Sequence, residues 1–264
     1  MPPSQVKISS VIPVKLIRKI RRKMEDYLPV KLVDRLDRFW VQTRLLFSKS
    51  MLAMVAGLLA FFIWVTIEME VFRFSDILEF LFLQATALTI LLHMGLWTRE
   101  KEYGTYELFI MRLKRPSRVI WSKLTVSFIW TILLIMPFFI GLTWFVTMNF
   151  KAVLLCLLFL IPTAMLTAIF TCIVSTFVRS SLPAAIISGI ILAIIAGILA
   201  KGQLPWSRYY NPFLNPLQEY FIENIPYRKQ MVFIVVNRLS IITGIGLLYW
   251  WLYNRMKVSE RWSK

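Results

Sequence analysis

The stretch Arg99-Glu100-Lys101-Glu102-Tyr103-Gly104-Thr105-Tyr106-Glu107 lies between two long apolar segments of this 264-residue chain. It brings three acids and two bases close to segments that are long enough to cross a membrane. Because charged side chains are costly in hydrocarbon, this stretch has to lie in water or among the lipid headgroups. It therefore marks the point at which the chain leaves the membrane on one side.

A short helix is predicted to start within this stretch. Thr105 can cap its first turn, where the helix dipole favours the acid Glu107. Leu108 and Met111 fall on one face at helical spacing, and Pro116 ends the helix. The result is a short helix in a loop between two membrane spans, on which another protein could act to move the membrane domain.

The composition is that of a membrane protein. Apolar residues make up 58% of the chain and its mean hydropathy is +0.66, whereas soluble domains are about 45–50% apolar. The formal charge of +17 would suggest nucleic acid in a soluble protein, but basic loops flanking membrane spans produce the same excess. The two cysteines, Cys156 and Cys172, lie in apolar runs and are predicted to pack rather than to form a disulfide framework.

Six segments have the roughly 20 apolar residues that a 30 Å hydrocarbon layer requires. They cover residues 50–67, 77–98, 121–147, 152–178, 182–200 and 230–253. Backbone groups find no hydrogen-bond partners in lipid, so all six are predicted to be helices. We therefore expect an all-α membrane protein with a six-helix domain over residues 50–253, in which Pro137 and Pro162 kink the third and fourth spans.

Basic residues predict the orientation. With a cytoplasmic N-terminus, the inner segments are residues 1–49, 99–123, 179–181 and 254–264, and they hold 24 of the 31 lysines and arginines. The outer segments 68–76, 148–151 and 201–229 hold six, and Arg238 lies inside a span. This bias favours two cytoplasmic termini, and it accounts for the net charge without a nucleic-acid partner.

The segment before the first span is basic and amphipathic. Residues 12–28 and the stretch from Leu32 to Phe47 each carry an apolar stripe, and Pro29 separates them. Such helices either lie in the membrane interface or pack on a cytoplasmic partner. Residues 1–49 are therefore predicted to be a cytoplasmic and interfacial region, and residues 254–264 a basic cytoplasmic tail.

The charged stretch resembles a known family signature. Its matching residues are Glu100, Glu102, Gly104, Thr105 and Glu107, followed by Pro116, Ser117, Arg118 and Lys123. This pattern is similar to the E-x-E-x-G-T-x-E signature of type-2 ABC transporter permeases, the membrane subunits of ABC exporters. One position departs from the family pattern, because Ser122 stands where a glycine usually precedes the lysine.

The resemblance implies a six-span permease with an N-terminal elbow helix, in the inner (plasma) membrane of the cell. Residues 99–120 would be the loop that couples it to two copies of a separate ATPase subunit. The implied coupling residues are Glu100, Glu102, Gly104, Thr105, Glu107, Leu108, Met111, Pro116 and Arg118. We expect Glu100 and Glu102 to pair with Arg99, Arg112 or Arg118, or with the ATPase.

The resemblance also implies how the complex is assembled and what it does. The chain would pair with itself or with a similar permease, surrounded by lipid, and would export an unidentified substrate. ATP and Mg²⁺ would bind the partner ATPase, and this chain would need no cofactor or metal. In similar permeases the outer segment 201–229 holds short re-entrant helices that close the outer end of the path. Asn215, Pro216 and Glu219 can begin one here, although an ordinary interfacial loop fits the same residues.

Catalytic signatures are missing from the sequence. There is no G-x-x-x-x-G-K-[ST] motif, no Ser/His/Asp set, and the single histidine His93 makes a weak metal site, so the chain is not expected to be an enzyme. Arg238 could face a water-filled path, or pair with Glu79 or with backbone carbonyls; alternatively, it forms a structural pair or snorkels to the outer surface. The alternative function is a membrane scaffold without a transport cycle, such as a component of a gliding or maturation machinery.

Overall fold

The computed structural model describes residues 39–43, 46–47, 49–68, 74–102, 116–148, 150–200, 211–213 and 227–262. The regular structure in these residues is entirely helical. The main helices are α3 (Lys49–Glu68), α4 (Phe74–His93), α5 (Gly95–Glu102), α7 (Pro116–Thr147), α8 (Phe150–Phe177), α9 (Ser181–Ala200) and α12 (Tyr227–Trp262). The expected all-α class is confirmed.

Five helical stretches are long and apolar enough to cross a membrane. They are Phe80–Arg99, Trp121–Gly141, Cys156–Phe177, Ser181–Ile198 and Ile234–Arg255. They correspond to the second to sixth predicted spans, and they are the mark of a multi-pass membrane protein. The first predicted span coincides with α3, whose apolar part, Lys49–Val65, is shorter than these five within the described residues.

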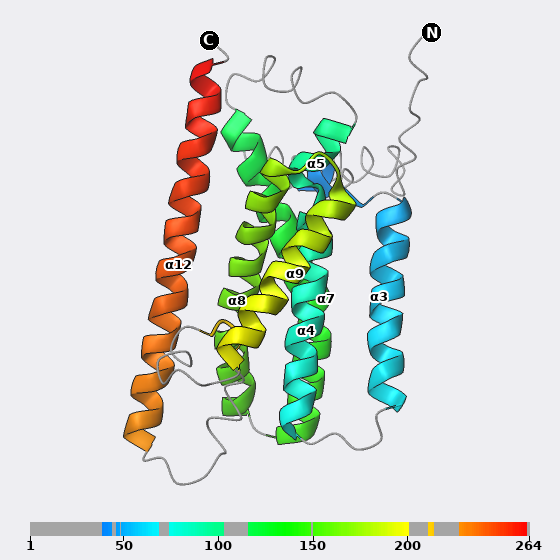
Figure 1. Ribbon diagram of the computed structural model, residues 1–264. Coiled ribbons are helices and arrows are strands. Elements are labelled where there is room, and N and C mark those ends of the chain that lie inside the picture. The colour runs from blue at the N-terminus through cyan, green and yellow to red at the C-terminus, as the bar shows by residue number, and fades with distance from the viewer. Residues whose placement is uncertain are drawn as a thin grey trace, which may run out of the picture.

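The helices form one bundle with α4 and α8 at its centre (Figure 1). Helix α4 packs on α7, α8, α9 and α3, and α12 packs on α8 and α7 at one flank. Helix α3 begins, and α12 finishes, at the same end of the bundle, which we call the terminal end (Figure 1). The connection between α8 and α9 also lies at this end, as does α5.

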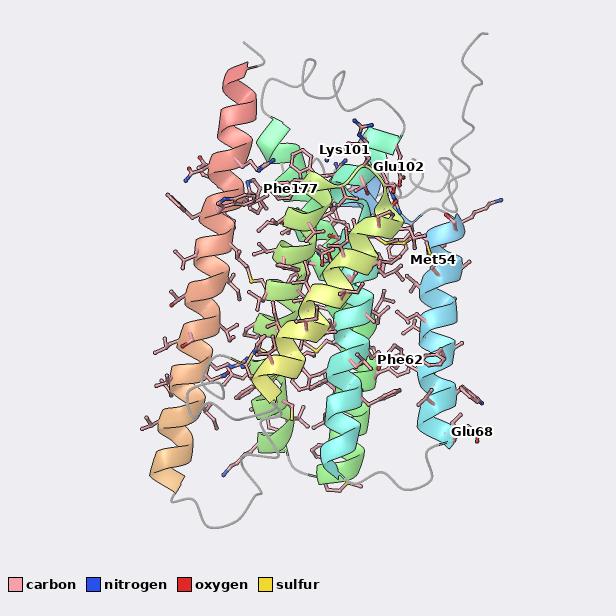
Figure 2. All side chains as sticks on the ribbon, in the orientation of Figure 1. Met54, Phe62, Glu68, Lys101, Glu102 and Phe177 are labelled. Atoms are coloured by element: carbon pink, nitrogen blue, oxygen red, sulfur yellow. The ribbon has the colours of Figure 1, made fainter. Side chains whose placement is uncertain are left out.

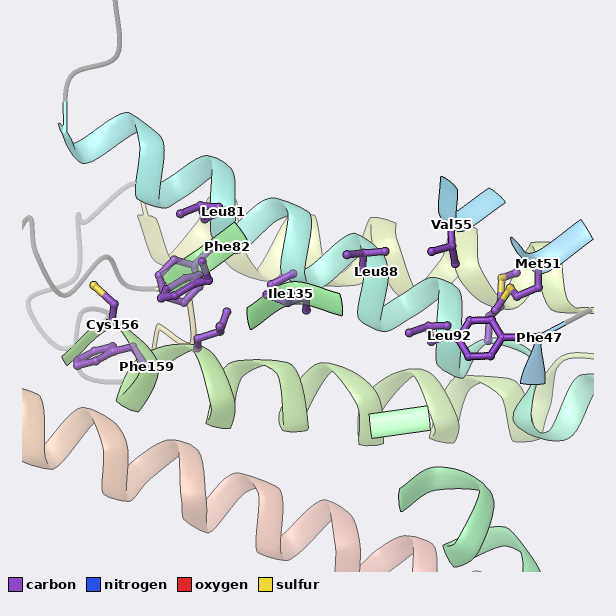
Figure 3. Packing of buried hydrophobic residues seen from close by; sticks show 14 of the residues in the cluster. Phe47, Met51, Val55, Leu81, Phe82, Leu88, Leu92, Ile135, Cys156 and Phe159 are labelled. Atoms are coloured by element: carbon purple, nitrogen blue, oxygen red, sulfur yellow. The ribbon is translucent and has the colours of Figure 1, made fainter. Parts of the chain in front are cut away.

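Large apolar side chains fill the centre of the bundle (Figure 3). Leu81, Leu88 and Leu92 of α4 are buried in one cluster with Ile135 of α7 and Phe159 of α8. Their spacing of seven and four residues places the three leucines on one face of α4. Because lipid is as apolar as leucine, this close packing stabilises the bundle through van der Waals contacts rather than through exclusion of water.

The free thiols belong to these apolar clusters. Cys156 lies in the same cluster as Phe159, and Cys172 is buried beside Leu96 and Trp97. Both cysteines are free and buried. The predicted packing role is confirmed for both.

Three element boundaries differ from the sequence-based expectation. The chain makes a turn at Met94 and continues as α5 to Glu102, so residues 99–102, expected in a loop, are helical. Pro116, expected to end a short helix, is instead the first residue of α7. Proline is favoured at this position because the N–H that it lacks would have no partner within the helix. Helix α12 extends to Trp262, into the expected tail. The short helix predicted from Thr105 lies outside the described residues.

The orientation of the bundle can be tested with two matched lysines. Lys49 starts α3 at the terminal end, Lys151 lies in the first turn of α8 at the opposite end, and both are exposed. The charge bias predicts that Lys151→Cys reacts with a membrane-impermeant thiol reagent in intact cells, whereas Lys49→Cys reacts only after permeabilisation. The buried native cysteines should give little background. Labelling of Lys49→Cys in intact cells would reverse the predicted orientation.

Candidate functional site

Helix α5 carries the charged stretch against the rest of the bundle. Its apolar residues Leu96 and Trp97 are buried in a cluster with Leu124 of α7 and Leu252 of α12. The side chain of Arg99 lies over Gly95, so closely that a Cβ added at Gly95 would be only 2.7 Å from Arg99 Nε. Arg99 Nη1 donates to the Leu46 carbonyl at 3.1 Å. These contacts hold α5 rigidly at the terminal end.

Lys101 caps the last turn of α8. Its Nζ donates to the carbonyls of Thr176 at 2.7 Å, Val178 at 3.1 Å and Ser175 at 3.3 Å. The final carbonyls of a helix lack partners within the helix and form the negative end of its dipole. The ammonium group therefore satisfies several acceptors at once and stabilises the end of α8.

Glu102 caps the first turn of α9. Its Oε1 accepts hydrogen bonds from the backbone N–H of Ser181 at 2.6 Å and from the Ser181 hydroxyl at 2.7 Å. Ser181 is the first residue of α9, where unpaired N–H groups and the helix dipole favour an anion. Figure 2 shows Lys101 and Glu102 together at the terminal end.

These two consecutive residues hold both sides of the connection between α8 and α9. We call this arrangement the Lys101–Glu102 clip. Burial, and secondly the positive charge of Arg255, lower the pKa of Lys101. Each half of the clip places a charge against the helix end of opposite polarity, so α5 is bonded directly to the end of α8 and the start of α9.

Of the predicted coupling residues, Glu102 is the one whose side-chain contacts the structure describes. Glu102 was expected to pair with an arginine or with an ATPase, and its partner here is the N-terminus of α9. Glu100 belongs to α5 and Arg118 to α7, but their side chains lie outside the described ones. Gly104, Thr105, Glu107, Leu108 and Met111 lie outside the described residues. Ser181 was not predicted as a functional residue, although a serine at the start of an apolar run is a recognisable helix cap.

A second polar cluster lies around Arg238, whose side chain is only 5% exposed. Its Nη1 donates to the Phe159 carbonyl at 3.1 Å. Its Nε donates to Asn237 Oδ1 at 2.9 Å, and its Nη2 donates to the same oxygen. The guanidinium carbon also lies 3.8 Å from the centroid of the Phe159 ring. The sequence left several partners open for Arg238, and the structure shows a backbone carbonyl among them. The side chain of Glu79, the other predicted partner, lies outside the described side chains.

The Phe159 carbonyl accepts hydrogen bonds from two side chains, those of Arg238 and Thr163. Threonine hydroxyls in helices commonly donate to the carbonyl four residues before them, and polar groups in membrane helices are satisfied by such neighbours. The Thr163 hydroxyl donates to the Phe159 carbonyl at 2.8 Å and also contacts the Pro212 carbonyl. The Asn237 amide donates to the Asn211 carbonyl at 3.2 Å. The cluster therefore ties α8, α12 and residues 211–213 together.

Apart from the start of α12 at Tyr227, residues 211–213 are the described part of the predicted outer segment. The backbone N–H of Phe213 donates to Asn211 Oδ1 at 3.0 Å, which folds this piece into a turn against the bundle. Asn215, Pro216 and Glu219, the predicted residues of an outer gate, follow it directly but lie outside the described residues.

The described part of the chain contains no group of three His, Cys, Asp or Glu side chains that could hold a metal ion. His93 is buried, with its Nδ1 at 2.7 Å from the Thr89 carbonyl.

The fold and these two clusters define the class as an all-helical, multi-pass membrane protein, with one polar cluster at the terminal end and the other buried inside the opposite half of the bundle. Comparison of the chain with protein-family models, with curated proteins and with solved structures finds no match in any of the three.

Proposed function

We propose that the chain is the permease subunit of an ATP-driven exporter of the type-2 ABC class. The observation that carries this proposal is the Lys101–Glu102 clip, which connects the charged stretch to the ends of two membrane helices. The similarity of the same stretch to the family signature, and the bias of basic residues toward one side, support it independently.

The clip supplies a mechanical link. A partner that pushes the loop between α5 and α7 also moves α5, and the clip passes that movement to the end of α8 and the start of α9. Hydrogen bonds to charged groups contribute about 1.5–3 kcal/mol each, although exposure of Glu102 reduces this value for its own bonds. Inside the opposite half of the bundle, the Arg238 cluster holds α8, α12 and residues 211–213 together. The proposed cycle alternates the two ends of the bundle between closed and open states.

In this proposed function, other subunits bind and hydrolyse ATP. Two copies of a separate ATPase bind ATP and Mg²⁺, and a second permease chain, identical or similar, completes the path. The chain itself catalyses no reaction, and the substrate moves outward or is lifted from the inner leaflet.

Co-purification tests the proposed function. An ATPase encoded beside this chain should remain bound in detergent, and its hydrolysis should change when the complex is reconstituted in lipid. Gly104→Val should release or uncouple it, because a side chain resists a backbone turn that glycine permits. Tyr106→Phe, in the same loop, is the matched control and should behave as the wild type. A wild-type chain that binds no ATPase, or does not alter its hydrolysis, would favour the scaffold function instead.

A further inference from the structure

A group of aromatic and basic side chains lies where the apolar helices finish at the terminal end. The membrane-compatible stretches of α8 and α12 both end there, at Phe177 and Arg255, and that of α7 begins at Trp121. These residues therefore mark the level at which hydrocarbon gives way to headgroups. Figure 2 shows Phe177 at this level, near Lys101.

Two exposed rings and a guanidinium form a stack between α8 and α12. The rings of Phe177 and Trp251 are stacked with centroids 6.1 Å apart and an interplanar angle of 29°. The guanidinium carbon of Arg255 lies 4.3 Å from the Phe177 centroid and 5.3 Å from the Trp251 centroid. Phe177 is 62% exposed and Trp251 is 37% exposed, so the rings cover no core and face outward.

Among the described side chains, positive charge is in excess at this place. Arg255 and Arg179 are exposed, and Lys101 lies close enough to Arg255 for the two charges to repel. The nearest described acid on α5, Glu102, is engaged with Ser181. Among the described side chains, Arg255 contacts the two rings and forms no ion pair with an acid. An anion here would relieve the repulsion between like charges.

We propose that Arg255, Phe177 and Trp251 form a binding site for the headgroup of an anionic phospholipid. The planar guanidinium, held over the rings, presents its N–H groups to the phosphate, a geometry that suits bidentate binding. The aromatic rings lie beside the glycerol and upper acyl chains, as interfacial aromatic residues do. Lipid suits the site better than a protein partner, because the rings are at the level where the apolar helix surface ends. The site does not require that the protein transport anything.

Titration with phosphatidylglycerol tests this site, with phosphatidylcholine as the zwitterionic reference and native mass spectrometry as the readout. Arg255→Gln should weaken phosphatidylglycerol binding about fivefold relative to phosphatidylcholine, the factor that corresponds to about 1 kcal/mol for one basic residue near an anionic surface. Arg255→Lys should lose part of this preference, because it keeps the charge without the planar fork. Lys49→Gln removes an exposed cation at the same end of the bundle and should leave the preference unchanged.

Several results would overturn the proposal. Equal losses in Arg255→Gln and Lys49→Gln would show general attraction to an anionic surface rather than a site. Displacement of phosphatidylglycerol by millimolar inorganic phosphate would show a site for free anions. Release of a bound protein by Arg255→Gln, with lipid binding unchanged, would show a protein-docking surface. Because lipid binding is measured on the isolated chain, its outcome is independent of ATPase binding.

Discussion

Asn237→Leu should destabilise the membrane domain more than any other single change considered for this chain. Asn237 Oδ1 accepts two hydrogen bonds from Arg238, and its amide donates to the Asn211 carbonyl. Among the described residues, removing it leaves the buried guanidinium with only the Phe159 carbonyl and ring as partners, and an uncompensated buried charge costs about 3–5 kcal/mol. Denaturant or thermal unfolding of the protein in lipid nanodiscs should show a loss of this size.

A double-mutant cycle separates charge from packing. Arg238→Leu should cost only about 1–3 kcal/mol, because it removes the buried charge and orphans the Asn237 amide oxygen. The double variant Asn237→Leu/Arg238→Leu should be more stable than Asn237→Leu alone, since no buried charge remains without partners. Thr243→Val, on an exposed part of α12, is the control and should change little. Equal costs for Asn237→Leu and the double variant would mean that the charge of Arg238 is compensated elsewhere.

Glu102→Ala should uncouple the two ends of the bundle while leaving it folded. The variant loses both hydrogen bonds to Ser181, but Glu102 is exposed, so the loss of stability should stay below about 1.5 kcal/mol. Under the proposed function, ATP-driven transport in proteoliposomes should fall on the order of tenfold, because α9 no longer follows α5; a tenfold change corresponds to about 1.4 kcal/mol.

Two further variants make this test specific. Glu102→Gln keeps an acceptor oxygen and should retain part of the coupling, whereas Ser181→Ala should lose only the hydroxyl contact and give a milder defect. Glu68→Ala removes an exposed acid from the far end of α3 and should behave as the wild type. Full coupled transport in Glu102→Ala would show that the clip stabilises the fold without transmitting movement.

The sequence predicted the helices of this protein well because each one follows from a local requirement. A long apolar run such as 182–200 has to be helical in lipid, and the structure places α9 at Ser181–Ala200. Boundaries were less certain where helices continue into water. Nothing in the local hydropathy shows that α5 continues through Arg99 to Glu102, because its stability comes from the burial of Leu96 and Trp97 and from the clip.

By itself, the sequence determined the all-helical membrane class and five of the spans. It also determined the packing role of both cysteines and the polar character of the stretch after Trp97. Each of these depends only on composition and spacing along the chain. Only the tertiary structure decided the partners of the charged side chains. Lys101 and Glu102 meet the ends of α8 and α9 more than 70 residues away, and Arg238 meets a carbonyl 79 residues away beside Pro162. A charge can be satisfied by a carbonyl, a helix end or another charge. Which of these lies within about 3 Å is set by how the helices pack, and the order of residues does not show it.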